Sequence, residues 1–243
     1  MDIEIREFIT YLHNIKKTSA NTEISYQRDL KKMAEFLEER GIRNCNDVKE
    51  LELEGYISYM EREKFASSSI SRSVASMRAF FQYLWKEGVI AKDPAENLKP
   101  PKVEKKAPEI LTIEEVDKLL QQPNLDTAKG VRDSAMLELL YATGMRVSEM
   151  LHLQIFDVNL QFGYVVCQEN GKERIIPIGI PCKKAMERYL ERGRTVFVKD
   201  DKETALFTNC SGKAMSRQGF WKVLKGYADG AGIKRDIAPH TLR

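Results

Sequence analysis

The sequence predicts a mainly α-helical protein of two domains, the second of which also contains a small antiparallel sheet. Three observations lead to this fold class. Apolar residues in the first 88 residues recur with the period of an amphipathic helix. Four prolines then fall between residues 94 and 108, where a helix cannot continue. Further on, two strand-like apolar runs flank Asn170-Gly171, a dipeptide typical of a tight hairpin turn.

The first half is expected to form a four-helix unit. The helices are expected at about residues 8–15, 22–40, 47–64 and 67–87. Ser19 or Asn21 can cap the second helix, and Gly41 and Gly88 end the second and the fourth. The apolar positions expected to face a common core are Phe8, Leu12, Ile15, Ile24, Leu30, Met33, Leu37, Val48, Leu51, Ile57, Met60, Ile70, Val74, Met77, Phe81 and Leu84.

The fourth helix also carries polar side chains away from its apolar stripe. They are Ser67, Ser68, Ser69, Ser71, Arg72, Ser73, Ser76 and Arg78. Small hydroxyls and arginines suit a surface that contacts phosphates. A solvated helix surface without a ligand explains the same residues equally well.

The proline-rich segment carries lysines and divides the chain. Between Lys99 and Lys106 it contains four lysines and one glutamate. Such a segment is expected to be an extended connection. The expected domains are therefore residues 1–100 and 109–243, joined by a linker at 101–108.

The second half is expected to mix helices with a hairpin. Thr112 and Glu115 form a capping box that opens a helix through Leu120. Further helices are expected at about 131–142, ended by Gly144, and at 147–151, 182–192 and 217–231. Strands at 164–167 and 174–178 would form the hairpin.

Composition and charge exclude several classes of protein. The chain has 243 residues, of which 42% are hydrophobic and 31% charged, with a formal net charge of +3. It can bury a core and is not a highly charged disordered tail. No apolar run approaches the ~18 residues of a membrane span, and no signal peptide is evident, so we expect a cytoplasmic protein without a membrane partner.

The four cysteines carry no metal or redox pattern. Cys45, Cys167, Cys182 and Cys210 form no C-x-x-C pair. We expect them to be buried, reduced thiols, and we expect no metal site.

Cationic residues are the candidate chemical groups of the second half. Arg146 stands between Gly144 and a short helix, Lys172 lies beside the hairpin turn, and His240 and Arg243 lie three residues apart. Arginine forks match phosphate oxygens, and a lysine or histidine can move a proton. Together these residue types suit phosphoryl transfer without a metal or cofactor. Each alone would more often be a surface or salt-bridge residue, so their order and context decide.

That order and context resemble the tyrosine recombinases, or phage-type integrases, and most closely their bacterial XerC/XerD branch. In the first half the resemblance rests on Asn21-Thr22 with Tyr26, Asp29 and Leu30, on Phe80-Phe81-Gln82-Tyr83-Leu84, and on Asp93-Pro94-Ala95-Glu96-Asn97-Leu98. In the second half it rests on Ala142-Thr143-Gly144-Met145-Arg146-Val147-Ser148-Glu149, Lys172-Glu173-Arg174-Ile175-Ile176-Pro177, Arg217-Gln218-Gly219-Phe220-Trp221 and Pro239-His240-Thr241-Leu242-Arg243. The type IB topoisomerases use a similar set of arginine, lysine and histidine, but the N-terminal matches favour the recombinases.

The resemblance implies a site-specific enzyme that breaks and rejoins DNA through a 3′-phosphotyrosyl intermediate, without a cofactor. Residues 1–100 would be the helical, SAM-like core-binding domain, and residues 109–243 the catalytic domain. The implied partners are duplex DNA and other recombinase protomers in a tetramer on paired sites, with a paralogous recombinase as one option. Chromosome partition at cell division and integration of a mobile element are both compatible with the match.

The resemblance also implies roles for individual residues. Arg146 and Arg243 match the two arginines that grip the scissile phosphate. Glu149 matches the acidic residue that supports the first arginine, although a plain surface carboxylate is the alternative. His240 matches the histidine that acts on the proton of the nucleophile.

The hairpin lysine of the family protonates the departing 5′ oxygen of DNA. Lys172 is the one lysine in this hairpin and is the expected match. This hairpin is one residue shorter than the usual family turn, so a gapped alignment places Asn170 there instead. In that case protonation of the leaving group would be impaired.

The sequence stops at Arg243, before the position of the attacking tyrosine and final helix of the family. Tyr141, Tyr164, Tyr189 and Tyr227 all precede Arg243 and match no nucleophile motif. We therefore expect this truncated chain to bind duplex DNA without cleaving it. The alternatives are a non-catalytic DNA-binding regulator that occupies recombination sites, an inert fragment, and a helical interaction module that does not bind DNA.

Overall fold

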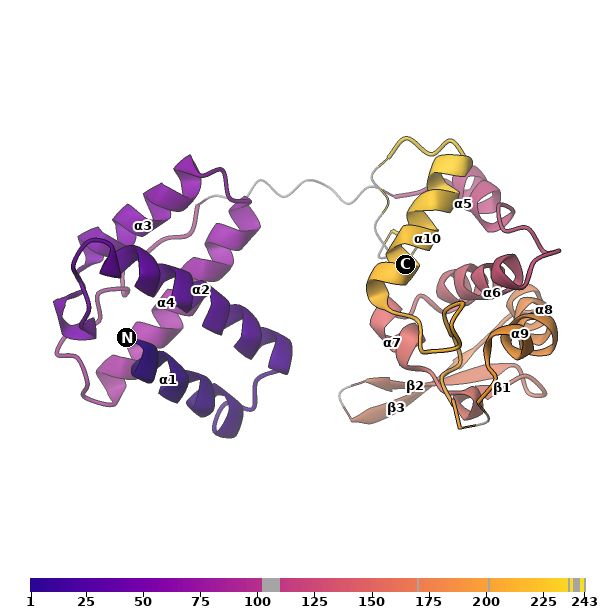
Figure 1. Cartoon of the computed structure of the whole chain (residues 1–243), viewed down its shortest axis with the longest axis horizontal. Coiled ribbons are helices and arrows are strands. Elements are labelled where there is room, and N and C mark those ends of the chain that lie inside the picture. Colours follow the sequence, from indigo (N-terminus) through magenta and orange to yellow (C-terminus); the bar gives the residue numbers. More distant parts are fainter. Residues whose placement is uncertain (102–109, 170, 201, 236, 238–240, 243) are drawn as a thin grey trace. The chain divides into compact units, whose positions relative to one another are not determined.

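The computed structural model describes residues 1–101, 110–169, 171–200, 202–235, 237 and 241–242. The chain divides into two compact units, Met1–Lys106 and Ala107–Arg243, each with its own hydrophobic core (Figure 1). The predicted fold class, mainly helical with two domains and a small antiparallel sheet, is confirmed. The expected linker at 101–108 lies outside the described residues except for Pro101.

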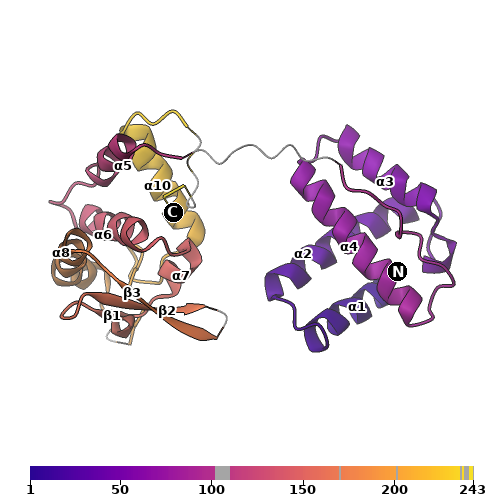
Figure 2. The ribbon, with the colours of Figure 1, turned by 180° about the vertical axis from the view of Figure 1, so that it is seen from behind.

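The N-terminal unit is built from four long helices, as the apolar spacing predicts. They are α1 (Asp2–Asn14), α2 (Ala20–Glu38), α3 (Glu50–Arg62) and α4 (Ser67–Lys86), with the short 3-10 turn η1 (Cys45–Asp47) before α3. Ser19 caps α2, because its hydroxyl oxygen accepts a hydrogen bond from the Thr22 N–H at 3.3 Å. Helix α4 contacts the other three helices (Figure 2).

Aromatic side chains join these helices into one core. Phe80 and Phe81 of α4 are completely buried, and Phe80 meets Phe8 of α1 edge-on with ring centroids 5.6 Å apart. Phe36 of α2 packs against Tyr56 of α3 with centroids 5.1 Å apart. Large buried rings remove much apolar surface from water, which stabilises the unit.

Three predicted core positions of this unit are wrong. Ile15, Ile24 and Leu51 are 68%, 54% and 74% exposed. Ile15 follows the last residue of α1, so the helical spacing no longer applies to it. Ile24 and Leu51 lie about 120° and about 160° around their helices from Leu30 and Leu53, which face the core, because each residue advances a helix by about 100°.

The C-terminal unit combines helices with one three-stranded sheet. Its elements are α5 (Ile113–Leu120), α6 (Ala128–Thr143), α7 (Val147–His152), η2 (Ile155–Asp157), β1 (Val158–Asn159), β2 (Tyr164–Glu169), β3 (Lys172–Pro177), α8 (Ile180–Arg188), η3 (Tyr189–Arg194), α9 (Thr195–Phe197) and α10 (Arg217–Gly230). The helix predicted at 182–192 is divided, because α8 continues as the π-helical turn η3.

Helix α6 is the central buried helix of this unit. Every residue from 130 to 137 is buried, and α6 contacts α5, α7, α8 and η3. Gly144 ends the helix in the left-handed conformation with φ 58°, and its N–H donates to the Leu140 carbonyl at 2.9 Å. Glycine adopts this conformation without the steric cost that a β-carbon imposes.

The sheet is antiparallel with the order β1-β2-β3. In the hairpin, Val165 pairs with Ile176 and Cys167 with Arg174, and Glu169 and Lys172 form the last pair before the turn. The predicted two-residue turn is confirmed by this register, and Gly171 has φ 76°. Strand β1 was not predicted, because two residues are too few to show an alternating pattern.

The cysteines agree with the sequence expectation at three positions out of four. Cys45, Cys167 and Cys182 are buried and form no disulfide, but Cys210 is exposed, so the expectation of burial is wrong there. Burial raises the pKa of Cys45 to about 11 and that of Cys182 to about 12, which makes both thiols poor nucleophiles near neutral pH.

Two features are absent from the part of the chain that the structure describes. Within these ranges of the chain, no helix has the length and apolar character needed to cross a bilayer. Nor does any group of histidine, cysteine, aspartate or glutamate side chains in the described segments form a candidate metal site.

Candidate functional site

The turn between α6 and α7 places Arg146 at the N-terminus of α7. Arg146 is the N-cap residue of that helix, with an extended backbone at φ −70° and ψ 145°. Its backbone N–H donates to Glu149 Oε2 at 2.6 Å, and its side-chain Nη1 donates to Glu149 Oε1 at 2.9 Å. A carboxylate in the first turn also interacts favourably with the positive end of the helix dipole.

The Glu149 carboxylate is shared with a second arginine. Arg174 Nη2, from β3, lies 3.5 Å from Glu149 Oε2. The Glu149 side chain is only 8% exposed, whereas those of Arg146 and Arg174 are 50% and 41% exposed. One buried carboxylate thus holds two accessible guanidinium groups, and such groups bind phosphate oxygens well.

Lys172 lies on the same face of the hairpin as Arg174. The two residues are separated by one position on β3, and side chains two apart in a strand point to the same side of the sheet. Lys172 is exposed, and β2, its partner strand, lies beside α7 (Figure 1). Lys172 therefore lies on the face of β3 that contacts Glu149 through Arg174.

The described part of the chain therefore contains three of the five predicted site residues. Arg146 and Glu149 are in direct contact, and Lys172 lies on the adjoining hairpin. His240 and Arg243 lie outside the described residues, as does Asn170, the alternative at the lysine position.

Arg174 is the residue of this cluster to which the sequence assigned no role. Two signals were available: its spacing from Lys172, which puts both on one face of a strand, and the acidic Glu149. Neither signal shows which strand packs beside α7, so the contact between Arg174 and Glu149 could not be predicted.

A second charge cluster lies buried in the same unit. Asp133 accepts hydrogen bonds from Arg132 at 2.6 and 2.9 Å, from Lys129 at 3.0 Å and from the Tyr227 hydroxyl at 2.9 Å. Arg132 also donates to the Thr208 carbonyl at 3.1 Å, which ties α6 to the segment before α10. The cluster is a structural connection between elements and not a phosphate site, because Arg132 and Asp133 are buried.

The hydroxyl groups of two tyrosines in this unit, Tyr227 and Tyr189, form hydrogen bonds within the fold. Burial, together with the Asp133 carboxylate, raises the pKa of the Tyr227 hydroxyl. Tyr189 is completely buried, its hydroxyl donates to the Leu206 carbonyl at 2.9 Å, and burial raises its pKa. The hydroxyls of both tyrosines thus have hydrogen-bond partners within this unit.

Fewer polar side chains of α4 reach the surface than the sequence indicated. Ser73 and Ser76 are buried, so they belong neither to a phosphate-contacting surface nor to a solvated one, the two readings that the sequence left open. Both lie on the core-facing side of α4, where small side chains allow close packing. Arg72 and Arg78 are exposed, and Arg72 forms a two-pronged ion pair with the buried Asp29 of α2 at 2.7 and 2.9 Å.

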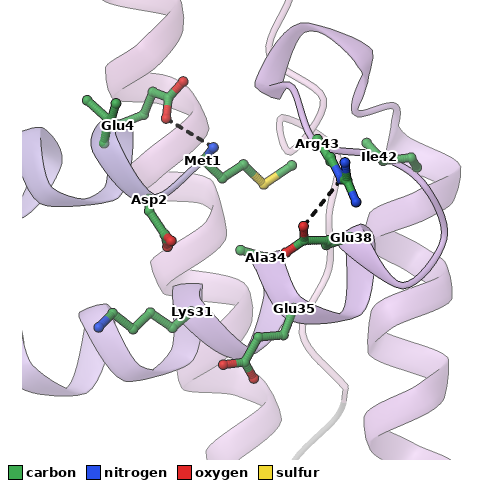
Figure 3. A pocket seen from close by; sticks show the side chains of 10 residues that line it. Met1, Asp2, Glu4, Lys31, Ala34, Glu35, Glu38, Ile42 and Arg43 are labelled. Carbon is green, nitrogen blue, oxygen red and sulfur yellow. Dashed lines mark ion pairs between the residues drawn. The ribbon is translucent and has the colours of Figure 1, made fainter.

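A cavity of about 520 Å³ lies in the N-terminal unit. Figure 3 shows it at the start of α1, beside α2 and the following turn. Its charged lining residues are Asp2, Glu4, Lys31, Glu35, Glu38 and Arg43. Four carboxylates against two basic side chains disfavour a phosphate, so this cavity is not a candidate DNA site.

Comparison with known families identifies both units. Residues 5–88 match the family model described as phage integrase, N-terminal SAM-like domain, and residues 109–243 match that of the phage integrase family. The chain belongs to the phage integrase family. The family match covers the helical N-terminal unit and the unit that holds Arg146, Glu149 and Lys172.

Curated members of the family resemble the chain over nearly its whole length. A putative tyrosine recombinase of Caldanaerobacter subterraneus is 41% identical over 240 residues, which cover 98% of this chain and 81% of the relative. The tyrosine recombinase XerD of Staphylococcus epidermidis is 39% identical over 100% of this chain and 83% of its own length. The tyrosine recombinase XerC of Herpetosiphon aurantiacus is 38% identical over 100% of this chain and 80% of its own length. The chain is a tyrosine recombinase of the XerC/XerD type.

Solved structures of other members share the fold. A lambda integrase dimer bound to a COC′ core site has a TM-score of 0.76 at 16% identity, covering 100% of this chain and 86% of that one. The XerH recombinase bound to its difH substrate has a TM-score of 0.72 at 19% identity, covering 100% of this chain and 72% of that one. At these identities the likeness shows the fold alone.

Proposed function

We propose that the chain binds duplex DNA and that Arg146, held by Glu149, is one of the groups that grip a backbone phosphate. The observation that carries this proposal is the accessible Arg146 guanidinium fixed by a buried carboxylate at a helix N-terminus. Because Glu149 already restricts the Arg146 side chain, binding of a phosphate costs little additional conformational entropy. More of the interaction free energy therefore contributes to affinity.

The other predicted residues would complete the phosphate site. Arg243 would supply the second arginine, and His240 would accept the proton of an attacking tyrosine. As the tyrosine oxygen bonds to phosphorus, the bond to the 5′ oxygen breaks, and Lys172 would give that oxygen its proton. The energy of the broken bond stays in the 3′-phosphotyrosyl link, so rejoining is the same step in reverse and consumes no cofactor.

The proposal for the 243-residue chain is binding without cleavage. It is supported by the tyrosines of the C-terminal unit, since Tyr189 and Tyr227 are engaged in hydrogen bonds and Tyr141 and Tyr164 match no nucleophile motif. A DNA-binding regulator at recombination sites is the second candidate function, and it shares this binding step. The XerD and XerC relatives and the DNA-bound lambda integrase dimer support the proposal that protomers pair on DNA. The partner protomer would be a second copy of this chain or a paralogous recombinase.

DNA affinity and adduct formation test this proposal together. Fluorescence anisotropy with a labelled duplex should show binding that weakens with salt. Arg146→Ala should lower the affinity about tenfold at 0.1 M salt, because one phosphate contact is lost. Arg188→Ala, on α8, is the matched control and should bind like the unaltered chain.

Denaturing gels of the chain with a nicked duplex test the second half of the proposal. No protein-linked DNA band is expected. A covalent band would show that a tyrosine of this chain is a nucleophile and would overturn binding without cleavage. Equal losses in Arg146→Ala and Arg188→Ala would instead overturn the assignment of Arg146 to the phosphate site.

A further inference from the structure

Two arginines from different elements meet at Glu149, and the proposed function uses only one of them. Arg146 comes from the start of α7, and Arg174 from the middle of β3. The carboxylate is 8% exposed, and the two guanidinium-bearing side chains are 50% and 41% exposed. The carboxylate is therefore largely buried, while the side chains of both arginines are partly exposed.

The charges of the three side chains indicate a role for Arg174. One arginine paired with one carboxylate has no net charge, and such a neutral pair attracts a phosphate only weakly. Arg146, Arg174 and Glu149 taken together carry one positive charge in excess. Arg174 thus offsets the carboxylate that fixes Arg146, so Arg146 can be both held in place and attractive to an anion.

The position of Arg174 on the hairpin adds a mechanical consequence. Lys172 and Arg174 occupy the same face of β3, two positions apart, close to the two-residue turn. The ion pair between Arg174 and Glu149 joins that face to the first turn of α7. The ion pair therefore fixes the position of side chains near the hairpin tip, such as Lys172, relative to Arg146.

We infer that Arg174 is a positioning residue of the phosphate site, which offsets the charge of Glu149 beside Arg146 and anchors the hairpin face that carries Lys172. The inference rests on the proposed function, because its ligand is a DNA phosphate. It adds to that function a further cationic side chain, contributed by the same strand as Lys172.

The test compares four variants of the 243-residue chain, Arg174→Gln, Arg174→Lys, Arg188→Gln and the double variant Arg174→Gln/Glu149→Gln. Affinity for a labelled duplex is measured by anisotropy over a range of KCl concentrations. Arg174→Gln should bind about tenfold more weakly at 0.1 M salt, and the slope of log affinity against log salt should fall by about one. Arg174→Lys keeps the charge and should keep most of the affinity, and Arg188→Gln should match the unaltered chain.

The double variant is the decisive measurement. Glu149→Gln removes the carboxylate charge that Arg174 no longer offsets, and the amide oxygen that takes its place can still accept a hydrogen bond from Arg146. The double variant should therefore recover most of the affinity lost in Arg174→Gln. A residue that merely supports packing would show no such recovery, and thermal unfolding of each variant reports on folding directly. Failure of the double variant to recover, or full affinity in Arg174→Gln, would overturn the inference while Arg146→Ala still reports on the proposed function. Absence of DNA binding by the unaltered chain would overturn both.

Discussion

Two adjacent charged residues of α6, Arg132 and Asp133, are 2% and 0% exposed. Charges so far from water are stable only when they are paired and hydrogen-bonded. Asp133 meets this condition with donors from Arg132, Lys129 and Tyr227. Because Tyr227 belongs to α10, the pairing also fixes one helix against another.

Removal of the Asp133 charge should destabilise the C-terminal unit strongly. In Asp133→Asn the buried Arg132 guanidinium loses its counter-charge, and breaking such a pair costs about 3–5 kcal/mol of unfolding free energy. Denaturant unfolding followed by circular dichroism measures the change. Glu187→Gln is the control, since the Lys183–Glu187 pair is solvent-accessible at 4.0 Å and should contribute less than about 1 kcal/mol. Similar losses in both variants would contradict the structural role of the cluster.

The site residues divide into those that local sequence reveals and those that it does not. Arg146 and Glu149 are three apart across a helix start, so their contact follows from helical geometry once α7 is predicted. The contact of Glu149 with Arg174 joins a helix to a strand, and that of Arg132 with Thr208 spans 76 positions. Contacts of this second kind depend on how elements pack, which residue spacing does not encode.

At the level of elements, the turn at Gly144 determines where Arg146 can point. Gly144 holds φ 58°, and two residues later Arg146 caps α7. A residue with a β-carbon is strained in this conformation, so the chain would tend to continue the helix or to shift the start of α7. The geometry of the proposed phosphate site thus depends on a residue that carries no side chain.

Gly144→Ala should lower both stability and DNA affinity. The strain should cost about 1 kcal/mol of unfolding free energy, and any displacement of Arg146 should weaken binding to duplex DNA. Gly226→Ala is the matched control, because Gly226 lies inside α10 with no atom within 4 Å of an added β-carbon. That control should gain about 0.5–1 kcal/mol from higher helix propensity. A gain in both variants would show that Gly144 is not required for its conformation.

Elements with long, regular patterns were predictable, and short or irregular ones were not. Helix α4 repeats its apolar positions over 20 residues, and the hairpin has a strong turn dipeptide, so both were predicted. The two-residue strand β1 exists because it pairs with β2. The π-helical turn η3 contains two buried residues, Tyr189 and Gly193, so its conformation accompanies packing against other elements. Both depend on neighbours that a local pattern cannot supply.

For the whole molecule, the defining feature is the presence of two separate hydrophobic cores. One core draws its residues from Ile5 to Leu98 and the other from Leu111 to Leu242, with no residue in common. Composition alone left open whether 243 residues form one large domain or two. The proline-rich segment indicated two, because it interrupts the helical pattern before the second core begins.

Substitutions in one core should therefore lower the stability of that unit selectively. Phe80 and Phe207 are both completely buried, Phe80 in the N-terminal core and Phe207 in the C-terminal core. Replacing either by alanine should cost its own unit about 3–5 kcal/mol, from lost apolar burial and the cavity that remains. Native-state hydrogen exchange of amides in α4 and α6 measures the two units in one experiment. Phe80→Ala should speed exchange in α4 and leave α6 protected, and Phe207→Ala should do the reverse. Equal loss of protection in both helices would mean that the chain unfolds as one cooperative unit, in which case the two cores are not independent sources of stability.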